Sequence, residues 1–282
     1  MPILASPGRP VNPARPGTTL RRESGSLRPV SSLALFTRPF LDLLRGEARC
    51  VGRARDLLLL GGGLVVGWWI YVPVHELLHA FACMAAGGEV SRLEIDPLYG
   101  GALLERWIPW VVAGGDYAGR LSGFDTGGSD LVYLATDLGP FVLVLFPGVW
   151  ALRRTARAGR PELFGMALPF ALAPLLSLTG DAYEIGSIVV TRVPPWAGET
   201  ARELLRGDDV LRIGDAVAAA GGGAAAWAGF VLAALLGTLW AFATYAVGGW
   251  VAARLGERPL AALRRPGEAG GAQVEQADAE TF

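Results

Sequence analysis

Long apolar runs separated by polar segments dominate the chain between residues 57 and 253. A helix needs roughly 20 apolar residues to cross the hydrocarbon core of a bilayer, and four runs reach that length. They cover residues 57–88, 131–152, 163–190 and 224–253. The pattern therefore predicts four transmembrane helices. Pro73 lies inside the first run, and because proline has no backbone N–H, we expect a kink there or a division into two helices.

The segments between the runs predict a small insert and a surface helix. Residues 89–130 are mixed in polarity and begin with the β-like stretch EVSRLEI. Residues 194–215 begin with two prolines and read as an exposed or interfacial helix. The predicted fold is therefore an all-α integral membrane protein. It has about four transmembrane helices and a small β-like or irregular insert after the first one.

The two ends of the chain are more polar. Residues 1–30 are rich in Pro, Arg, Ser and Gly, a composition typical of disorder. The following residues, 31–50, alternate apolar clusters with charges and predict an amphipathic helix on the membrane surface. We expect an N-terminal arm (1–50), a polytopic membrane domain (51–254) and a flexible tail (255–282).

Composition supports a membrane protein and excludes other classes. The chain has 282 residues, 52% of them hydrophobic, and a mean hydropathy of +0.38, which is too apolar for an ordinary soluble domain. A formal net charge of −1 gives no reason to expect a nucleic-acid partner. The two cysteines, Cys50 and Cys83, lie on dissimilar segments, so a disulfide framework is not expected.

The arginines predict how the chain is oriented. Clusters precede the first run, separate the second from the third, and follow the fourth, whereas acids dilute the arginines of the other two connections. The clusters are Arg45, Arg49, Arg53 and Arg55; Arg153, Arg154, Arg157 and Arg160; and Arg254, Arg258, Arg264 and Arg265. The positive-inside rule then places both termini in the cytoplasm. We expect a multi-pass protein of a bacterial cell membrane.

The only two histidines of the chain form an HExxH motif inside the first run. His75 and His79 are four residues apart, so on a helix they share one face, and Glu76 follows the first of them. Two imidazoles at this spacing can hold one zinc ion, with the glutamate as general base. The alternative is a pair of core histidines bonded to backbone groups. Ionisable residues are costly inside a membrane, which favours the functional interpretation.

A third zinc ligand is expected from another span. His75 lies 20 residues after Arg55 and Asp181 lies 21 residues after Arg160. At about 1.5 Å per helical residue, both lie at similar depth on helices that start from the same side. Asp181 is therefore the favoured ligand. Glu184, one turn further on, and Asp137, inside the second run, remain alternatives for this role.

Three motifs carry a family resemblance. HELLHAFACMAAGGEVSRLEI, at residues 75–95, resembles the active-site helix of the site-two protease family of intramembrane zinc metalloproteases. The stretch LATDLGPFVLVLF, with Gly139 and Pro140, resembles the Gly-Pro-containing span of that family. PLLSLTGDAYEIGS resembles the span that supplies the third zinc ligand, here Asp181. The family's usual Leu-Asp-Gly is replaced by Gly180-Asp181-Ala182, and no PDZ-like insert is evident.

The resemblance implies an activity and its partners. We expect a zinc-dependent intramembrane endopeptidase, which hydrolyses a peptide bond in or near a transmembrane segment of a membrane-protein substrate. Its zinc ligands are His75, His79 and Asp181, its catalytic residue is Glu76, and it resides in the lipid bilayer. The alternative is a non-hydrolytic scaffold or transporter-like protein with a structural metal, which has no need of Glu76 as a base. The predicted orientation places the metal in the outer half of the membrane, whereas the family usually holds it nearer the cytoplasm.

Overall fold

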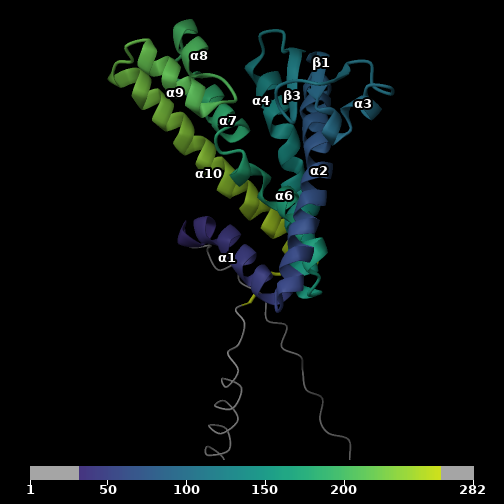
Figure 1. The fold of residues 1–282 in the computed structure, drawn as a ribbon. Coiled ribbons are helices and arrows are strands. Elements are labelled where there is room, and N and C mark those ends of the chain that lie inside the picture. Colours follow the sequence, from purple (N-terminus) through teal and green to yellow (C-terminus); the bar gives the residue numbers. More distant parts are fainter. Residues whose placement is uncertain (1–31, 262–282) are drawn as a thin grey trace, which may run out of the picture. The chain divides into compact units, whose positions relative to one another are not determined.

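The computed structural model describes residues 32–261, which are mostly helical (Figure 1). Within them, four helical stretches are long and apolar enough to cross a membrane. They are Ala54–Ala85, Asp130–Arg157, Pro161–Val190 and Ala224–Arg254. The predicted fold class, an all-α integral membrane protein with four transmembrane helices, is therefore confirmed. The predicted disorder of residues 1–30 concerns residues outside the described part of the chain.

The first span is one continuous helix, α2 (Ala54–Ala85). Of the two alternatives expected at Pro73, a kink or a division into two helices, the division is wrong, because the helix runs through this residue. A proline removes one backbone hydrogen bond, a loss that neighbouring helices can compensate in a membrane protein. The consequence is that the motif at residues 75–79 stands on a long, regular element.

The second span is interrupted, which the apolar pattern does not predict. It consists of α4 (Asp130–Leu138), a 3-10 turn (Gly139–Phe141), a π-helical turn (Val144–Gly148) and α5 (Val149–Arg157). Phe146, the residue before Pro147, has φ −161° and ψ 133° and is therefore extended rather than helical. A proline disfavours the helical conformation of the residue that precedes it, which explains where the break falls.

The third span is also divided into two helices. α6 (Pro161–Leu176) ends before a four-residue turn, and α7 (Asp181–Val190) begins after it. Asp181 is thus the first residue of α7, next to Gly180. The break matters for function because it lets a carboxylate project from a helix end inside a membrane-spanning region.

The insert after α2 forms a small mixed sheet. It comprises β1 (Glu89–Ile95), a 3-10 turn (Pro97–Tyr99), α3 (Gly101–Leu104), β2 (Val111–Ala113) and β3 (Gly119–Asp125). β1 is central, parallel to β2 and antiparallel to β3, with Leu93 opposite both Val111 and Leu121. Leu93 and Ile95 are buried against Ala80 of α2. This contact holds the sheet at the C-terminal end of α2 (Figure 1), so β3 can reach the motif.

Between α7 and Arg254, the chain forms three further helices. They are α8 (Glu199–Leu205), α9 (Val210–Ala219) and α10 (Ala224–Arg254). α10 packs closely on α7: a Cβ atom added at Gly237 would lie 2.1 Å from the carbonyl oxygen of Ala182. A Cβ atom added at Gly186 of α7 would lie 2.0 Å from the carbonyl oxygen of Ala233 in α10. Small residues allow helix backbones to approach in this way, and here the contact fixes the first turn of α7.

A buried ion pair joins distant parts of the chain at the other end of the molecule. The predicted amphipathic helix is present as α1 (Ser32–Cys50), and its Asp42 is fully buried. A terminal guanidinium nitrogen of Arg153 lies 2.7 Å from Asp42 Oδ2, and the hydroxyl of Tyr245 donates to the same oxygen. The Leu260 N–H donates to the other oxygen. Residues 255–261 were expected in the flexible tail, yet Leu260 is only 1% exposed.

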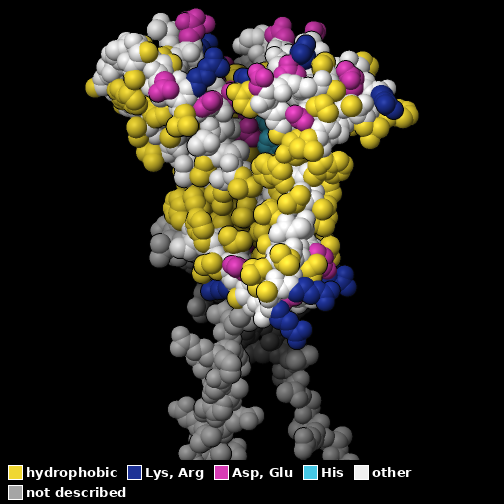
Figure 2. Space-filling model, in the orientation of Figure 1, with side chains coloured by type: hydrophobic (Ala, Val, Ile, Leu, Met, Phe, Trp, Pro, Cys, Tyr) yellow, Lys and Arg dark blue, Asp and Glu magenta, His cyan; other side chains and the backbone are white. Residues whose placement is uncertain are grey.

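Charged and apolar side chains separate along the molecule. Figure 2 shows hydrophobic side chains in a broad belt, with charged side chains gathered at both of its ends. At the end near α1, Arg154 and Arg157 of α5 both pair with Glu257, which follows α10. Arg45 and Arg49 of α1 donate to the carbonyl oxygens of Leu260 and Ala261 in the same segment, so members of all three arginine clusters lie at one end, as the orientation argument requires.

Two neighbouring glycines of α2 provide a test of this packing. A Cβ atom at Gly63 would lie 1.9 Å from the carbonyl oxygen of Glu162 in α6, whereas one at Gly62 meets nothing within 4 Å. We predict that Gly63→Ala lowers the stability of the protein by about 1–3 kcal/mol because the helices must separate. Gly62→Ala should be neutral or slightly stabilising. Thermal unfolding of both variants in detergent measures the difference, and equal midpoints would contradict the close α2–α6 contact.

Candidate metal centre

His75 and His79 stand one turn apart on α2 with their Nε2 atoms facing each other. Both residues are buried, and the two Nε2 atoms are 3.1 Å apart. The carbonyl oxygen of Thr136 lies 2.9 Å from Nδ1 of His79. A carbonyl can only accept, so this Nδ1 carries the proton and Nε2 is left with a lone pair. Tyr71, one turn before His75, lies 2.7 Å from its Nδ1 and holds that ring in place.

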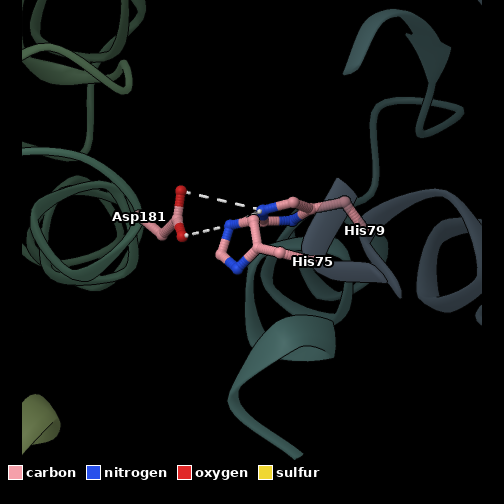
Figure 3. Close-up of side chains that lie close together, drawn as sticks. All are labelled: His75, His79 and Asp181. Atoms are coloured by element: carbon pink, nitrogen blue, oxygen red, sulfur yellow. Dashed lines mark hydrogen bonds and ion pairs between the residues drawn. The ribbon is translucent and has the colours of Figure 1, made fainter. Parts of the chain in front are cut away.

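Asp181 reaches this pair from α7. Figure 3 shows its carboxylate pointing across the space between the helices toward both imidazoles. Its Oδ2 is 3.1 Å from Nε2 of His75, and its Oδ1 is 3.7 Å from Nε2 of His79. One ligand atom from each of the three residues lies within 4.8 Å of the others. Among residues 32–261, this is the one group of three or more His, Cys, Asp or Glu side chains arranged so closely.

The three residues fit a divalent metal ion. Oδ2 of Asp181 is buried and accepts no hydrogen bond. A buried carboxylate oxygen without a donor is unfavourable, and a bound cation removes that penalty. Two imidazole nitrogens and one carboxylate are a ligand set found in catalytic zinc sites, which keep a fourth position open. Imidazole nitrogens and a carboxylate oxygen are donors that suit zinc.

The other two candidates for the third ligand lie apart from this group. Glu184, one turn after Asp181, accepts a hydrogen bond from the hydroxyl of Tyr133. Asp137, on α4, is 3% exposed, and its Oδ2 has no hydrogen-bond partner. Neither carboxylate belongs to the cluster of close ligand atoms. The structure therefore brings Asp181, rather than Glu184 or Asp137, to the two histidines.

Glu76 faces a cavity beside the histidines. The cavity has a volume of about 300 Å³. It is lined by Glu76, His79, Gly119, Arg120, Leu121, Phe124, Tyr133, Thr136, Asp137, Asp181, Glu184, Gly207 and Asp208. A Cβ atom at Gly119 would lie only 2.4 Å from Cγ of Glu76, so the start of β3 can approach this close only as glycine. Strand β3 therefore runs along the same cavity as the carboxylate.

A second, apolar groove is linked to the centre through a smaller cavity. It has a volume of about 480 Å³ and is lined by Leu64, Val65, Trp68, Trp69, Leu98, Tyr99 and Leu176. A smaller cavity of about 180 Å³ shares Trp68 and Leu176 with this groove, and His75, Glu76 and Asp181 with the centre. The centre thus borders both a cavity rich in acidic residues and a smaller cavity that leads to the apolar groove.

Some residues of the site could not be recognised from the sequence. Tyr71 stands four residues before His75, and this helical spacing was a usable signal. Thr136 and Gly119 reach the site through contacts between distant segments, for which the sequence pattern offers no signal. No family model, curated protein or solved structure matches the chain significantly, so the assignment of the site rests on its own residues.

Metal content tests the assignment of ligands. We predict about one zinc ion per purified chain, because the three side chains form one compact site. The double variant His75→Ala/His79→Ala should lose it, and Asp181→Asn should hold it more weakly because a neutral amide is a poorer ligand. Asp137→Asn and Glu184→Gln are matched carboxylate controls and should retain the metal. Elemental analysis in detergent measures this. Equal metal in wild type and the double variant would contradict the site, and loss in either control would reassign the third ligand.

Proposed function

We propose that the protein is a zinc-dependent intramembrane endopeptidase that resembles the site-two proteases. One observation supports this most directly: Glu76 lies beside a compact His75–His79–Asp181 group within membrane-spanning helices. A site with a purely structural metal has no need of an adjacent carboxylate that faces a cavity. The substrate in this proposal is a membrane protein, cleaved in or near its transmembrane segment.

The residues divide the chemistry between them. His75, His79 and Asp181 hold the metal. When bound, zinc polarises the scissile carbonyl and lowers the pKa of water. Glu76, which faces the cavity, takes the proton from the attacking water and passes it to the leaving amine. Thr136 and Tyr71 keep the two imidazole rings oriented through their Nδ1 atoms.

Strand β3 offers a way to hold the substrate backbone. It is an edge strand, since β1 is its partner in the sheet order β2-β1-β3. Gly119, Arg120 and Leu121 of β3 line the cavity that contains Glu76. A peptide bond inside a helix is shielded from attack, so a substrate segment must unwind, and an extended segment can then pair with the free strand edge.

The site also has a proposed place in the membrane. The arginine-rich helix ends near α1 are cytoplasmic in this proposal, in a bacterial cell membrane, with the N-terminus on the same side. His75 lies 20 residues further along from Arg55, on the continuous helix α2. The metal centre therefore belongs to the half of the membrane away from the cytoplasm, unlike that of the family it resembles.

Catalysis provides the decisive test. We predict that Glu76→Gln keeps the fold and the zinc but lowers cleavage by about 10²–10⁴-fold or more, because the amide cannot accept the proton. Glu105→Gln, which removes the same charge from an exposed position, is the control. The assay co-expresses a panel of single-span membrane proteins with the enzyme and detects shortened products. Equal cleavage by Glu76→Gln and wild type would exclude the mechanism. Zinc binding without cleavage of any panel member would favour a structural metal.

Orientation is tested by cysteine labelling. Ser122 in β3 and Ala158 after α5 are both exposed and lie at opposite ends of the spans. The two native cysteines are buried, and burial raises the pKa of Cys50 to about 11, so the wild type should label poorly. On intact cells, an impermeant maleimide should label Ser122→Cys and not Ala158→Cys. The opposite result would reverse the orientation and place the site near the cytoplasm.

A further inference from the structure

The cavity beside the metal centre contains more carboxylates than the proposed chemistry uses. Five acidic residues line it, whereas Arg120 is the one arginine or lysine among its lining residues. Asp181 is assigned to the metal and Glu76 to proton transfer. Asp208, the third, pairs with Arg120 at 3.6 Å, and both side chains are partly exposed. This leaves Asp137 and Glu184 without a role in the reaction.

Asp137 and Glu184 lack a partner of opposite charge. They are 3% and 8% exposed, and no ion pair joins either of them to a basic side chain among residues 32–261. Oδ2 of Asp137 accepts no hydrogen bond at all, and Glu184 accepts one from Tyr133. A buried carboxylate without a counter-charge is unfavourable in its charged form, so a ligand that brings a positive charge into this part of the cavity would gain from both carboxylates.

The number of ligands that lie close together distinguishes between two kinds of cation. A compact metal ion needs several ligand atoms close together, and within the described residues only the His75–His79–Asp181 group meets that condition. The remaining carboxylates surround a volume of about 300 Å³ instead. That volume is near the lower limit for small-ligand pockets and suits an extended side chain. An ammonium or guanidinium group can bond several separated carboxylates at once.

We propose that this cavity is a specificity subsite for a basic side chain, lysine or arginine, next to the scissile bond of the substrate. The inference rests on the proposed endopeptidase function and adds the class of substrate. Asp137 and Glu184 are its specificity-determining residues. Because Glu76, His79 and Asp181 line the same cavity, a side chain bound there lies directly beside the metal centre. A substrate with a basic residue at the edge of its transmembrane segment satisfies this requirement, since a long Lys or Arg side chain near a helix end extends along the apolar surface toward the membrane interface.

The test uses metal-binding peptide hydroxamates, which need no turnover. The compounds form two series, which differ in whether the variable side chain lies before or after the hydroxamate. Each series contains one compound with a lysine side chain and one with a norleucine side chain. Their affinities for the zinc-loaded full chain are measured by calorimetry in detergent. In at least one of the two series, we expect the lysine compound to bind about tenfold or more tightly than the norleucine compound. The reason is that a hydrogen bond to a charged group contributes about this much to the binding free energy.

Variants connect that preference to the cavity. Asp137→Asn and Glu184→Gln should each reduce the preference for lysine while leaving zinc content and the affinity of the norleucine compound unchanged. Asp116→Asn, which removes a charge from an exposed position, should keep the preference. Because Asn and Gln are nearly isosteric and relieve a buried charge, we expect both variants to fold, and thermal unfolding checks this. Using two variants keeps the test valid if one of them is unstable.

Each other outcome overturns the subsite in a recognisable way. Equal binding of the lysine and norleucine compounds would exclude it and leave the proposed function intact. A preference for lysine that persists in both Asp137→Asn and Glu184→Gln would also exclude the subsite and leave the proposed function intact. A second zinc ion per chain, lost in Asp137→Asn, would make the cavity a metal site instead. If neither hydroxamate binds the zinc-loaded wild type, the proposed function fails, and the subsite fails with it.

Discussion

Everything at the candidate centre depends on one constraint: polar groups inside a membrane-spanning region must find partners within the protein. Asp181 faces His75 and His79 across the space between α7 and α2, but its Oδ2 accepts no hydrogen bond there, so a bound cation would supply the partner that this oxygen lacks. The two imidazoles in turn have their outer nitrogens held by Thr136 and Tyr71. Because lipid offers no hydrogen bonds, each of these side chains is fixed by the others, and the helices that carry them are fixed as well.

The breaks in the spans follow from the same constraint. α6 and α7 are separate helices, so Asp181 can project from a helix start, and α4 ends before the irregular segment around Phe146. Irregular backbone at membrane depth is tolerated where protein covers it, and Gly148 in this segment lies against the backbone of Phe170 in α6. The long continuous helix α2 then acts as the reference element, because both the sheet and α6 pack on it.

The sequence predicted what depends on local pattern and composition. Four long apolar runs were enough to find the spans, and the spacing of His75 and His79 was enough to place both on one helical face. The breaks in the second and third spans were missed because an apolar run looks the same whether it is helical or interrupted. Prolines show the limit most clearly: Pro73 is accommodated in a helix, whereas Pro147 follows an extended residue. Whether a proline is accommodated in a helix depends on the segments that pack around it. Those segments are distant in the sequence, so the residues near the proline carry no signal for the outcome.

The buried pair of Arg153 and Asp42 has a consequence for biosynthesis. Arg153 also donates to the carbonyl oxygens of Gly249 and Glu257, and the N–H of Leu260 completes the bonding of Asp42. These groups come from α1, α5, the end of α10 and the segment after it. The cluster can therefore close only after the ribosome has made residue 260, long after α1 has emerged. Until then, water has to supply part of the hydrogen bonding of Asp42 and Arg153, and water is available at the membrane surface, where the amphipathic helix α1 is expected to lie.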